Sequence, residues 1–136
     1  MSKTCVLPDV NLLLAYGWRS HASHDETRRW FASLSKFATC AITELGFLRV
    51  SMSPGYRASQ TDAAAVLTSL TSQSAARFLD CKTTPTALPA VSSYKDITDA
   101  YLVALARQHS CRFATLDEGV LKAAWAKGIA FHPFRG

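Results

Sequence analysis

Two aspartates in the stretch 97–119 are placed where a parallel α/β fold binds its ligands. Asp99 follows Thr98, which is expected to cap a helix, so Asp99 falls in the first helical turn. Asp117 comes directly after the apolar run 111–116, which indicates a short buried strand. Ligands of open α/β sheets bind beyond the carboxyl ends of the strands and at helix N-termini. The two carboxylates are therefore expected to share one site.

Two further acids occupy the same kinds of position earlier in the chain. Asp9 follows the apolar strand expected at 4–7, and Asn11 comes two residues later. Glu44 lies in the first turn of a helix that Thr43 is expected to cap. If the sheet is parallel, all four carboxylates can converge above its carboxyl edge.

Four carboxylates in one place require compensation and suggest a particular chemistry. Two unit charges about 4 Å apart repel by ~4 kcal/mol at an effective dielectric constant of about 20, so protons or a cation must offset them. Oxygen-only ligands select a hard cation such as Mg²⁺ or Mn²⁺. Such a cation makes a bound water a nucleophile and neutralises charge on a phosphate oxygen, which favours phosphodiester hydrolysis.

Each acid also has a purely structural explanation. Asp99 and Glu44 could simply favour the dipoles of the helices that they open. Asp117 could be a turn residue before Gly119. Asp9 is harder to explain this way, because a carboxylate at the end of an apolar strand is costly without a partner. Spacing alone leaves the metal site and the structural explanation equally open.

The elements that must position these acids alternate between strand and helix. Apolar runs predict strands at 4–7, 37–42, 77–81, 111–116 and 129–131. Capping patterns and helical periodicity predict helices at 12–16, 24–36, 43–50, 63–73, 98–106 and 118–127, with Ser23–Glu26 and Ser59–Asp62 as capping pairs and Gly128 after the last helix. The segment 82–95, rich in Thr, Pro and Ser, is expected to be a mobile loop beside the site. This alternation predicts an α/β fold with a parallel sheet and helices on both faces.

Composition bounds the class of protein. With 136 residues, 49% hydrophobic and 18% charged, the chain is expected to form one globular domain, 1–136. A net charge of +5 suits an anionic partner such as nucleic acid, although Lys and Arg are scattered. No signal peptide and no apolar run of about 20 residues is present, so a cytoplasmic protein without a membrane segment is expected.

The four cysteines do not indicate zinc. No C-x-x-C pair occurs, and each cysteine lies in an apolar, strand-like context. They are interpreted as small core residues rather than disulfides.

Four segments closely resemble the PIN-domain ribonucleases, specifically the VapC toxins of toxin–antitoxin pairs: LPDVNLLLAY, FATCAITELGFLRVSMSP, DITDAYLVALA and RFATLDEGV. They occur in the order of that family from Cys5 to near the C-terminus, and TELGFLRV resembles one VapC subgroup. The resemblance implies a three-layer α/β sandwich around a mostly parallel sheet. It also implies a Mg²⁺ or Mn²⁺ site in an endoribonuclease, whose metal-activated water cuts RNA to leave 5′-phosphate and 3′-hydroxyl ends. The family's conserved acids fall on Asp9, Glu44, Asp99 and Asp117, with Asn11 and Thr115 supporting the site.

The resemblance also implies partners. A type II toxin is paired with a cognate VapB-type antitoxin that binds this domain and blocks its site. Family members commonly form homodimers, and the apolar helix segment 100–106 is expected to leave surface for a second copy. One departure from the subgroup is Asp96, where Gln is common; this extra acid could assist metal binding or cap the helix, and capping is favoured.

Other interpretations are weaker. His21 and His24 could ligate a metal, but no third ligand accompanies them. Asp9 and Asn11 resemble an aspartyl-phosphate motif, in which a second Asp would replace Asn11. Arg49 could meet a phosphate or pair with an acid. A non-catalytic RNA- or partner-binding module remains the main alternative, and DNA cleavage is disfavoured because the chain lacks the additional elements of flap nucleases.

Overall fold

A computed structural model describes residues 4–135. Five short strands form one sheet in the order β3-β2-β1-β4-β5, and every neighbouring pair is parallel. The strands are β1 Cys5–Pro8, β2 Phe37–Cys40, β3 Ala76–Leu79, β4 Cys111–Ala114 and β5 Ala130–Phe131. The predicted parallel sheet is confirmed, with all five strands near their expected positions.

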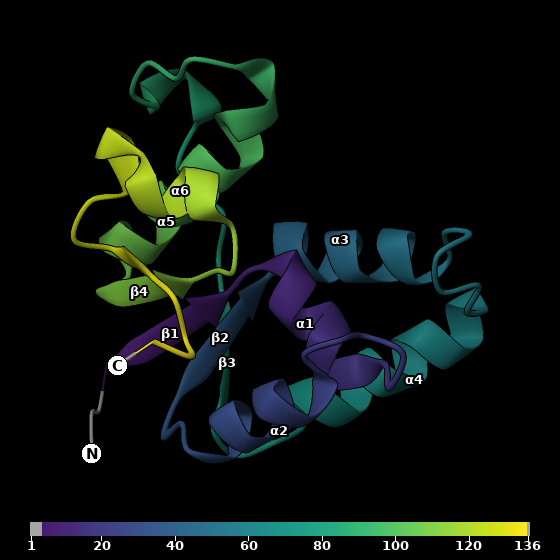
Figure 1. Ribbon diagram of the computed structural model, residues 1–136. Helices are drawn as coiled ribbons and strands as arrows, with labels where there is room; N and C mark the ends of the chain where they lie inside the picture. Colours follow the sequence, from purple (N-terminus) through teal and green to yellow (C-terminus); the bar gives the residue numbers. More distant parts are fainter. Residues whose placement is uncertain (1–3, 136) are drawn as a thin grey trace.

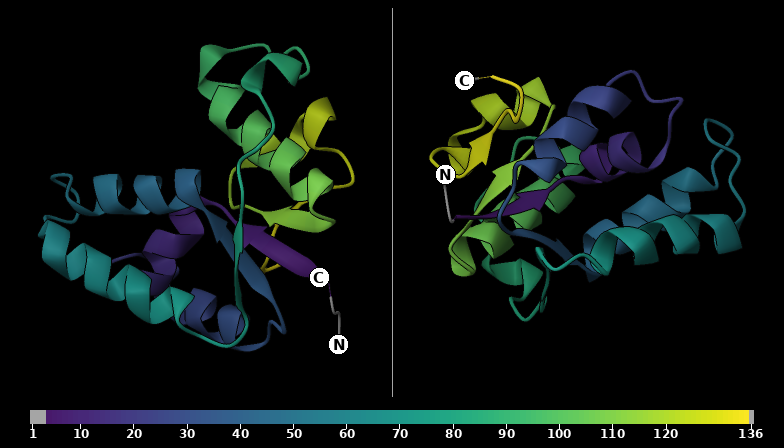
Figure 2. Two further views of the ribbon diagram at one scale, coloured as in Figure 1. Left: turned by 180° about the vertical axis from the view of Figure 1, so that it is seen from behind. Right: turned by 90° about the horizontal axis from the view of Figure 1, so that it is seen from below.

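Helices cover both faces of the sheet (Figure 1). Residues 4–135 contain α1 Val10–Gly17, α2 His24–Ala32, α3 Ala41–Ser51, α4 Gln60–Thr71, α5 Ile97–Gln108 and α6 Glu118–Lys122, with 3₁₀ turns η1 Pro85–Ala87, η2 Tyr94–Asp96 and η3 Ala124–Ala126. The α3–α4 pair extends away from the sheet in every view of Figures 1 and 2. Within the described chain, no helix has the length and apolar character needed to cross a membrane.

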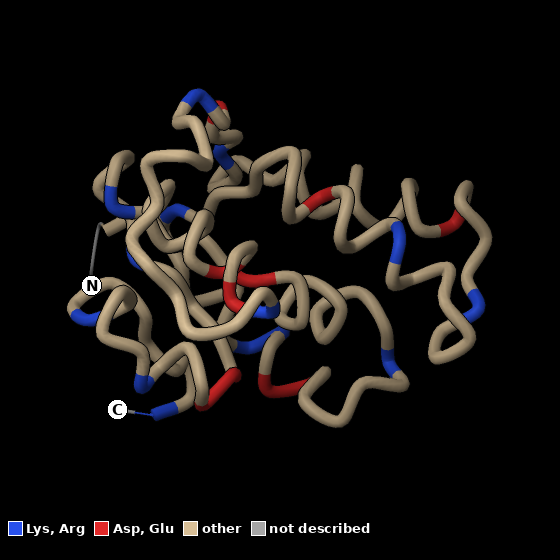
Figure 3. Tube along the Cα trace, turned by 90° about the horizontal axis from the view of Figure 1, so that it is seen from above, with Lys and Arg blue, Asp and Glu red and all other residues tan. Residues whose placement is uncertain are grey.

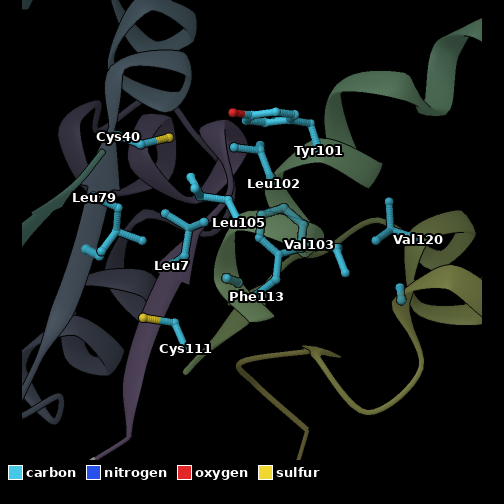
Figure 4. Close-up of a cluster of buried hydrophobic side chains, with 13 residues drawn as sticks. Leu7, Cys40, Leu79, Tyr101, Leu102, Val103, Leu105, Cys111, Phe113 and Val120 are labelled. Atoms are coloured by element: carbon cyan, nitrogen blue, oxygen red, sulfur yellow. The ribbon is translucent and has the colours of Figure 1, made fainter. Parts of the chain in front are cut away.

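Two cores form the three-layer arrangement. One core lies between the sheet and α5, where Leu7, Phe113 and Leu105 meet (Figure 4). The other lies on the opposite face, where Phe37 packs against residues of α1, α2, α3 and α4 such as Leu13, and a smaller cluster around Val6 and Ala114 adjoins it. Because successive strand residues point to opposite faces, each strand contributes apolar side chains to both faces of the sheet.

The central strand β1 pairs the start of the described chain with its last third. Cys5 pairs with Cys111, and the register continues to Pro8 opposite Ala114. The backbone N–H of Asp9 extends this pairing by donating to the carbonyl oxygen of Ala114 at 2.9 Å. Asp9 therefore lies at the edge of the sheet where β4 ends, next to the first residues after β4.

Several predicted helix caps are wrong. Cys40, not Thr43, is the N-cap of α3, and the hydroxyl of Thr43 accepts a hydrogen bond from the Cys40 N–H at 3.1 Å. Asp96, not Thr98, holds the N-cap position of α5. A hydroxyl three residues into a helix can bond back to the capping residue, so the sequence signal for the start is displaced.

Of the two predicted capping pairs, one is wrong and one is confirmed, and the last predicted helix is shorter than expected. Ser23 makes no side-chain capping bond, whereas Ser59 accepts from the Asp62 N–H at 3.0 Å as predicted. The helix expected at 118–127 is broken, because Ala123 is extended between α6 and η3. Gly128 has the positive φ of 82° that suits a glycine after a helical turn.

The expected surface for a second copy on α5 is wrong, and the expected burial of the cysteines is confirmed only in part. The segment 100–106 of α5 is buried within the chain itself, with Leu102 and Leu105 almost wholly covered, so it offers little surface to a second copy. Of the four cysteines, Cys40 and Cys111 are buried core residues and Cys5 is half-buried, but Cys81 is exposed.

Candidate active site

Asp9 is the buried member of the site. It caps α1, and its Oδ1 accepts from the Leu12 N–H at 3.0 Å. Its Oδ2 accepts a hydrogen bond from the hydroxyl of Thr115, a fully buried residue just after β4. Only 8% of Asp9 is exposed. The two bonds fix the carboxylate at the carboxyl edge of the sheet.

Asp117 and Thr115 link the end of β4 to Asp9. The Asp117 N–H donates to the Thr115 hydroxyl oxygen at 3.1 Å. The Asp117 carboxylate caps α6 by accepting from the N–H groups of Gly119 at 2.8 Å and Val120 at 3.3 Å. Asp117 is thus both a helix cap and an exposed charge beside the buried Asp9.

Asp99 comes from α5, which covers the face of the sheet opposite to α1. It is half-buried in the first turn of α5, as predicted. Among the described residues, no side chain or backbone group donates a hydrogen bond to its carboxylate. A half-buried carboxylate without a donor is one that a cation or water must compensate.

The charges of the three aspartates act on one another. Burial raises the pKa of Asp9 to about 6, opposed by the hydrogen bonds from Thr115 and Leu12 and reinforced by the charge of Asp117. Burial also raises the pKa of Asp99 to about 6, and the charges of Asp9, Asp117 and Asp96 add to this increase. At neutral pH the site therefore carries negative charge that the protein itself does not offset.

Within residues 4–135, the contact that Glu44 makes is with Thr39 and not with these aspartates. It lies in the first turn of α3, as expected, but its Oε2 accepts a hydrogen bond from the Thr39 hydroxyl at 2.6 Å. Both residues line a cavity of about 340 Å³ with Thr71, Ala76, Arg77 and Phe78. The charge of Glu44 is not among those that raise the pKa of Asp9 or Asp99. Nothing in the sequence near Glu44 indicates Thr39 as its partner.

The remaining polar candidates lie at the start of α1, at the end of α3 and at the start of α5. The exposed Asn11 contacts His21, whose Nε2 is 2.9 Å from the Asn11 Oδ1. Arg49 is exposed in the last turn of α3 and, within residues 4–135, forms no ion pair. Asp96 occupies the N-cap position of α5 without a side-chain capping bond, and its charge raises the pKa of Asp99.

Carboxylate oxygens are suitable ligands for a hard cation, although these carboxylates do not form a closed cage. Across residues 4–135, no group of three His, Cys, Asp or Glu side chains converges on a point that could hold a metal. Mg²⁺, however, keeps several waters and is usually bound through only one or two carboxylates. Asp99, which lacks a donor, and Asp9 beside it supply that number, and their raised pKa values mean that a cation would stabilise both.

Removing the Thr115 hydroxyl is expected to loosen the buried end of the site. Thr115→Val keeps the shape of the side chain but deletes the donor to Asp9 and the acceptor for the Asp117 N–H. The free energy of unfolding should fall by about 1–3 kcal/mol, because buried groups lose their partners. Urea denaturation at pH 7.5 measures this, with the exposed Thr86→Val as the matched control. Equal stability of the Thr115 variant and the wild type would contradict the described bonds.

Comparisons with known proteins assign this arrangement to a family. Residues 6–126 match the PIN domain model. Ribonuclease VapC38 of Mycobacterium tuberculosis is 39% identical over 125 residues, which cover 87% of this chain and 89% of that protein. The chain therefore belongs to the PIN domain family, among the VapC-type ribonucleases.

Two solved structures share the fold. The crystal structure of VapC20 from Mycobacterium tuberculosis, a sarcin–ricin loop cleaving toxin, has a TM-score of 0.65 at 15% identity and covers 83% of this chain and 90% of its own. VapBC2 from Rickettsia felis, bound to a DNA fragment from their promoter, has a TM-score of 0.63 at 12% identity and covers 95% of this chain and 98% of its own. These likenesses concern the fold.

Proposed function

We propose that this chain is a Mg²⁺-dependent endoribonuclease, with Mn²⁺ as a possible substitute, and the toxin component of a type II toxin–antitoxin system. One observation carries the proposal. The Thr115 hydroxyl joins Asp9 and Asp117 at two strand ends, and the charges of both raise the pKa of Asp99 at the start of α5. The VapC-type relatives, each named a ribonuclease, support the same reaction class.

Each residue of the proposed site has a separate task. Asp9 and Asp99 hold the cation, and Thr115 and Asp117 keep the Asp9 carboxylate in place. When bound, Mg²⁺ makes water a better nucleophile and offsets the charge that develops on the phosphate. Glu44 joins the site in this proposal only if its carboxylate leaves Thr39 when cation or RNA binds.

Helix dipoles favour an RNA phosphate at this edge. Asp9 caps α1 and Asp99 lies in the first turn of α5, so both helices direct their positive N-terminal ends towards the site. Lys and Arg are spread over the whole trace rather than gathered on one face (Figure 3). The net charge of +5 then supplies a general attraction to RNA that salt should weaken.

The proposal is tested by RNA cleavage with the purified wild-type protein. Defined RNA cuts should form in Mg²⁺ or Mn²⁺ and disappear in EDTA, and the fragments should carry 5′-phosphate ends. Cutting that persists in EDTA would oppose the metal requirement. If the folded protein cuts no RNA with either metal across transfer, ribosomal and messenger RNA, the enzyme proposal fails.

Two partners belong to the proposal. A cognate VapB-type antitoxin should bind the chain and block the acidic edge; the Rickettsia felis structure contains such a pair. A homodimer also stays in the proposal, although α5 does not supply its surface. The exposed Leu45 of α3 and Met52, which follows the end of α3, are the alternative apolar surface, and light scattering of Leu45→Glu against wild type tests it.

The alternative function is a non-catalytic RNA- or partner-binding module. It is favoured by the placement of Glu44 on Thr39 and by the fact that both oxygens of Asp9 already accept hydrogen bonds within the chain. In that case the protein would bind RNA in the absence of metal and cut none of it. Binding and cleavage measured on the same RNA distinguish the two functions.

A further inference from the structure

The loop between α1 and α2 folds back along α1 and is fixed there by its own hydrogen bonds. The His21 N–H donates to the Trp18 carbonyl at 3.2 Å, and the His24 N–H donates to the His21 carbonyl at 3.1 Å. The His24 Nδ1–H donates to the Ala15 carbonyl at 2.7 Å, because a carbonyl can only accept. The backbone bonds at His21 hold its ring beside α1, and the His24 side chain separately tethers the start of α2.

The contacts of the His21 ring determine which of its nitrogens carries the proton. The Ser23 N–H donates to Nδ1 at 3.0 Å, so Nδ1 must be an acceptor without a proton. The neutral ring then has its proton on Nε2, which donates to the Asn11 Oδ1 at 2.9 Å. Burial and the neighbouring His24 lower the pKa of His21, which favours the same neutral form.

This bond sets the orientation of the Asn11 amide. With Oδ1 occupied by His21, the NH₂ group of Asn11 points to the other side, and no acceptor among residues 4–135 takes its protons. Asn11 is the second residue of α1, and its backbone N–H lies close enough to the Asp9 carboxylate to lower the pKa of Asp9. Two N–H donors that have no acceptor within residues 4–135 therefore project from the second residue of α1, next to the helix start that Asp9 caps.

We propose that His21 is a positioning residue for RNA cleavage: it holds the Asn11 amide so that the NH₂ group, and not the carbonyl oxygen, faces the phosphodiester. The inference rests on the proposed ribonuclease function. An amide oxygen would repel a phosphate, whereas an NH₂ group donates to it. Without His21, no other described residue contacts the side chain of Asn11 to select between these two orientations.

Two substitutions at position 21 separate this role from simple tethering of the loop. His21→Gln places an NH₂ group near the former Nε2 and can still donate to Asn11. His21→Asn keeps an acceptor for the Ser23 N–H near the former Nδ1 but is too short to reach Asn11. His21→Asn should lower kcat about tenfold, the usual cost of losing a partner that orients a site residue, and His21→Gln should restore most of it.

A double-mutant cycle and a matched control complete the experiment. In an Asn11→Ala background, His21→Asn should cause no additional loss of kcat, because the group that it positions is gone. His24→Ala breaks the neighbouring tether to Ala15 and should lower the melting temperature without lowering kcat. Melting curves show which variants are folded.

The outcomes are distinct. Equal losses from His21→Asn and His21→Gln, or the same loss in wild-type and Asn11→Ala backgrounds, would mean that His21 only tethers the loop. A kcat loss in His24→Ala as large as that in His21→Asn would mean the same. If wild type cuts no RNA with Mg²⁺ or Mn²⁺, the proposed function fails and this role fails with it.

Discussion

Asp99→Asn is expected to lower metal-dependent RNA cleavage by at least about a hundredfold while making the metal-free protein more stable. The loss of activity follows because the change removes one of the two carboxylates proposed to hold the cation, and metal-site substitutions carry costs of this order or larger. The gain in stability follows because burial and three neighbouring acids disfavour the charged form of Asp99. An amide of the same shape avoids that repulsion.

The stability effect has a definite dependence on pH. The pKa of Asp99 is raised from 3.8 to about 6, so its ionisation costs the folded state nothing below about pH 4 and its full amount above about pH 6. Wild-type stability should therefore fall relative to Asp99→Asn as the pH rises through this window. At pH 7.5 in EDTA the variant should melt about 3 °C or more above wild type.

Cleavage assays and melting curves on the same preparations measure both effects. Asp62→Asn is the matched control, because Asp62 is also a first-turn acid but is exposed and belongs to α4. It should change neither cleavage nor the pH dependence. Cleavage by Asp99→Asn at the wild-type rate would indicate a contaminating nuclease and remove the support for Asp99 as a ligand. A lower melting temperature at pH 7.5 would contradict the described electrostatics.

Gly46→Ala is expected to destabilise the fold by about 1–3 kcal/mol, although alanine is the better helix former. Gly46 lies in α3 where this helix crosses α1, and a Cβ added there would be only 2.6 Å from Cγ2 of Val10. Valine is stiff about χ1, so the contact is not relieved by a small rotation. Since Val10 follows Asp9 directly, displacement of α1 should also lower cleavage.

A second substitution at Val10, the residue that the new Cβ would meet, should relieve the clash. Val10→Ala removes the methyl groups that meet the new Cβ, so the double variant should be more stable than the sum of the two single changes predicts. Urea denaturation of the four proteins measures this coupling. If Gly46→Ala alone raises stability, the helices do not approach as closely as described.

The sequence predicted the order of the helices and strands, and the positions of three aspartates along them, better than the residues that cap the helices. Asp9 and Asp117 were predictable because each follows an apolar run, and parallel strands bring such residues to one edge. The start of α3 was displaced because Thr43 bonds back to Cys40 instead of capping the helix itself.

Side-chain directions were beyond what spacing can predict. A first-turn position places Glu44 at the correct end of α3, but its direction depends on the Thr39 hydroxyl of the neighbouring strand. The bond between His21 and Asn11 likewise depends on how a loop folds back, and no periodicity encodes that. The burial of 100–106 follows from apolar residues on every side of the helix, but the sequence did not show that this chain itself, rather than a second copy, covers them.

The order of the strands has a consequence for how the protein is made. Strand β1 is central, yet its partner β4 begins more than a hundred residues later, as the pairing of Cys5 with Cys111 shows. A chain still emerging from the ribosome therefore cannot form the pairing between β1 and β4 until its last quarter is synthesised. Contacts so distant in sequence also make folding slow. The three aspartates would remain apart throughout this period, so any catalytic competence would arrive as a late event in biosynthesis.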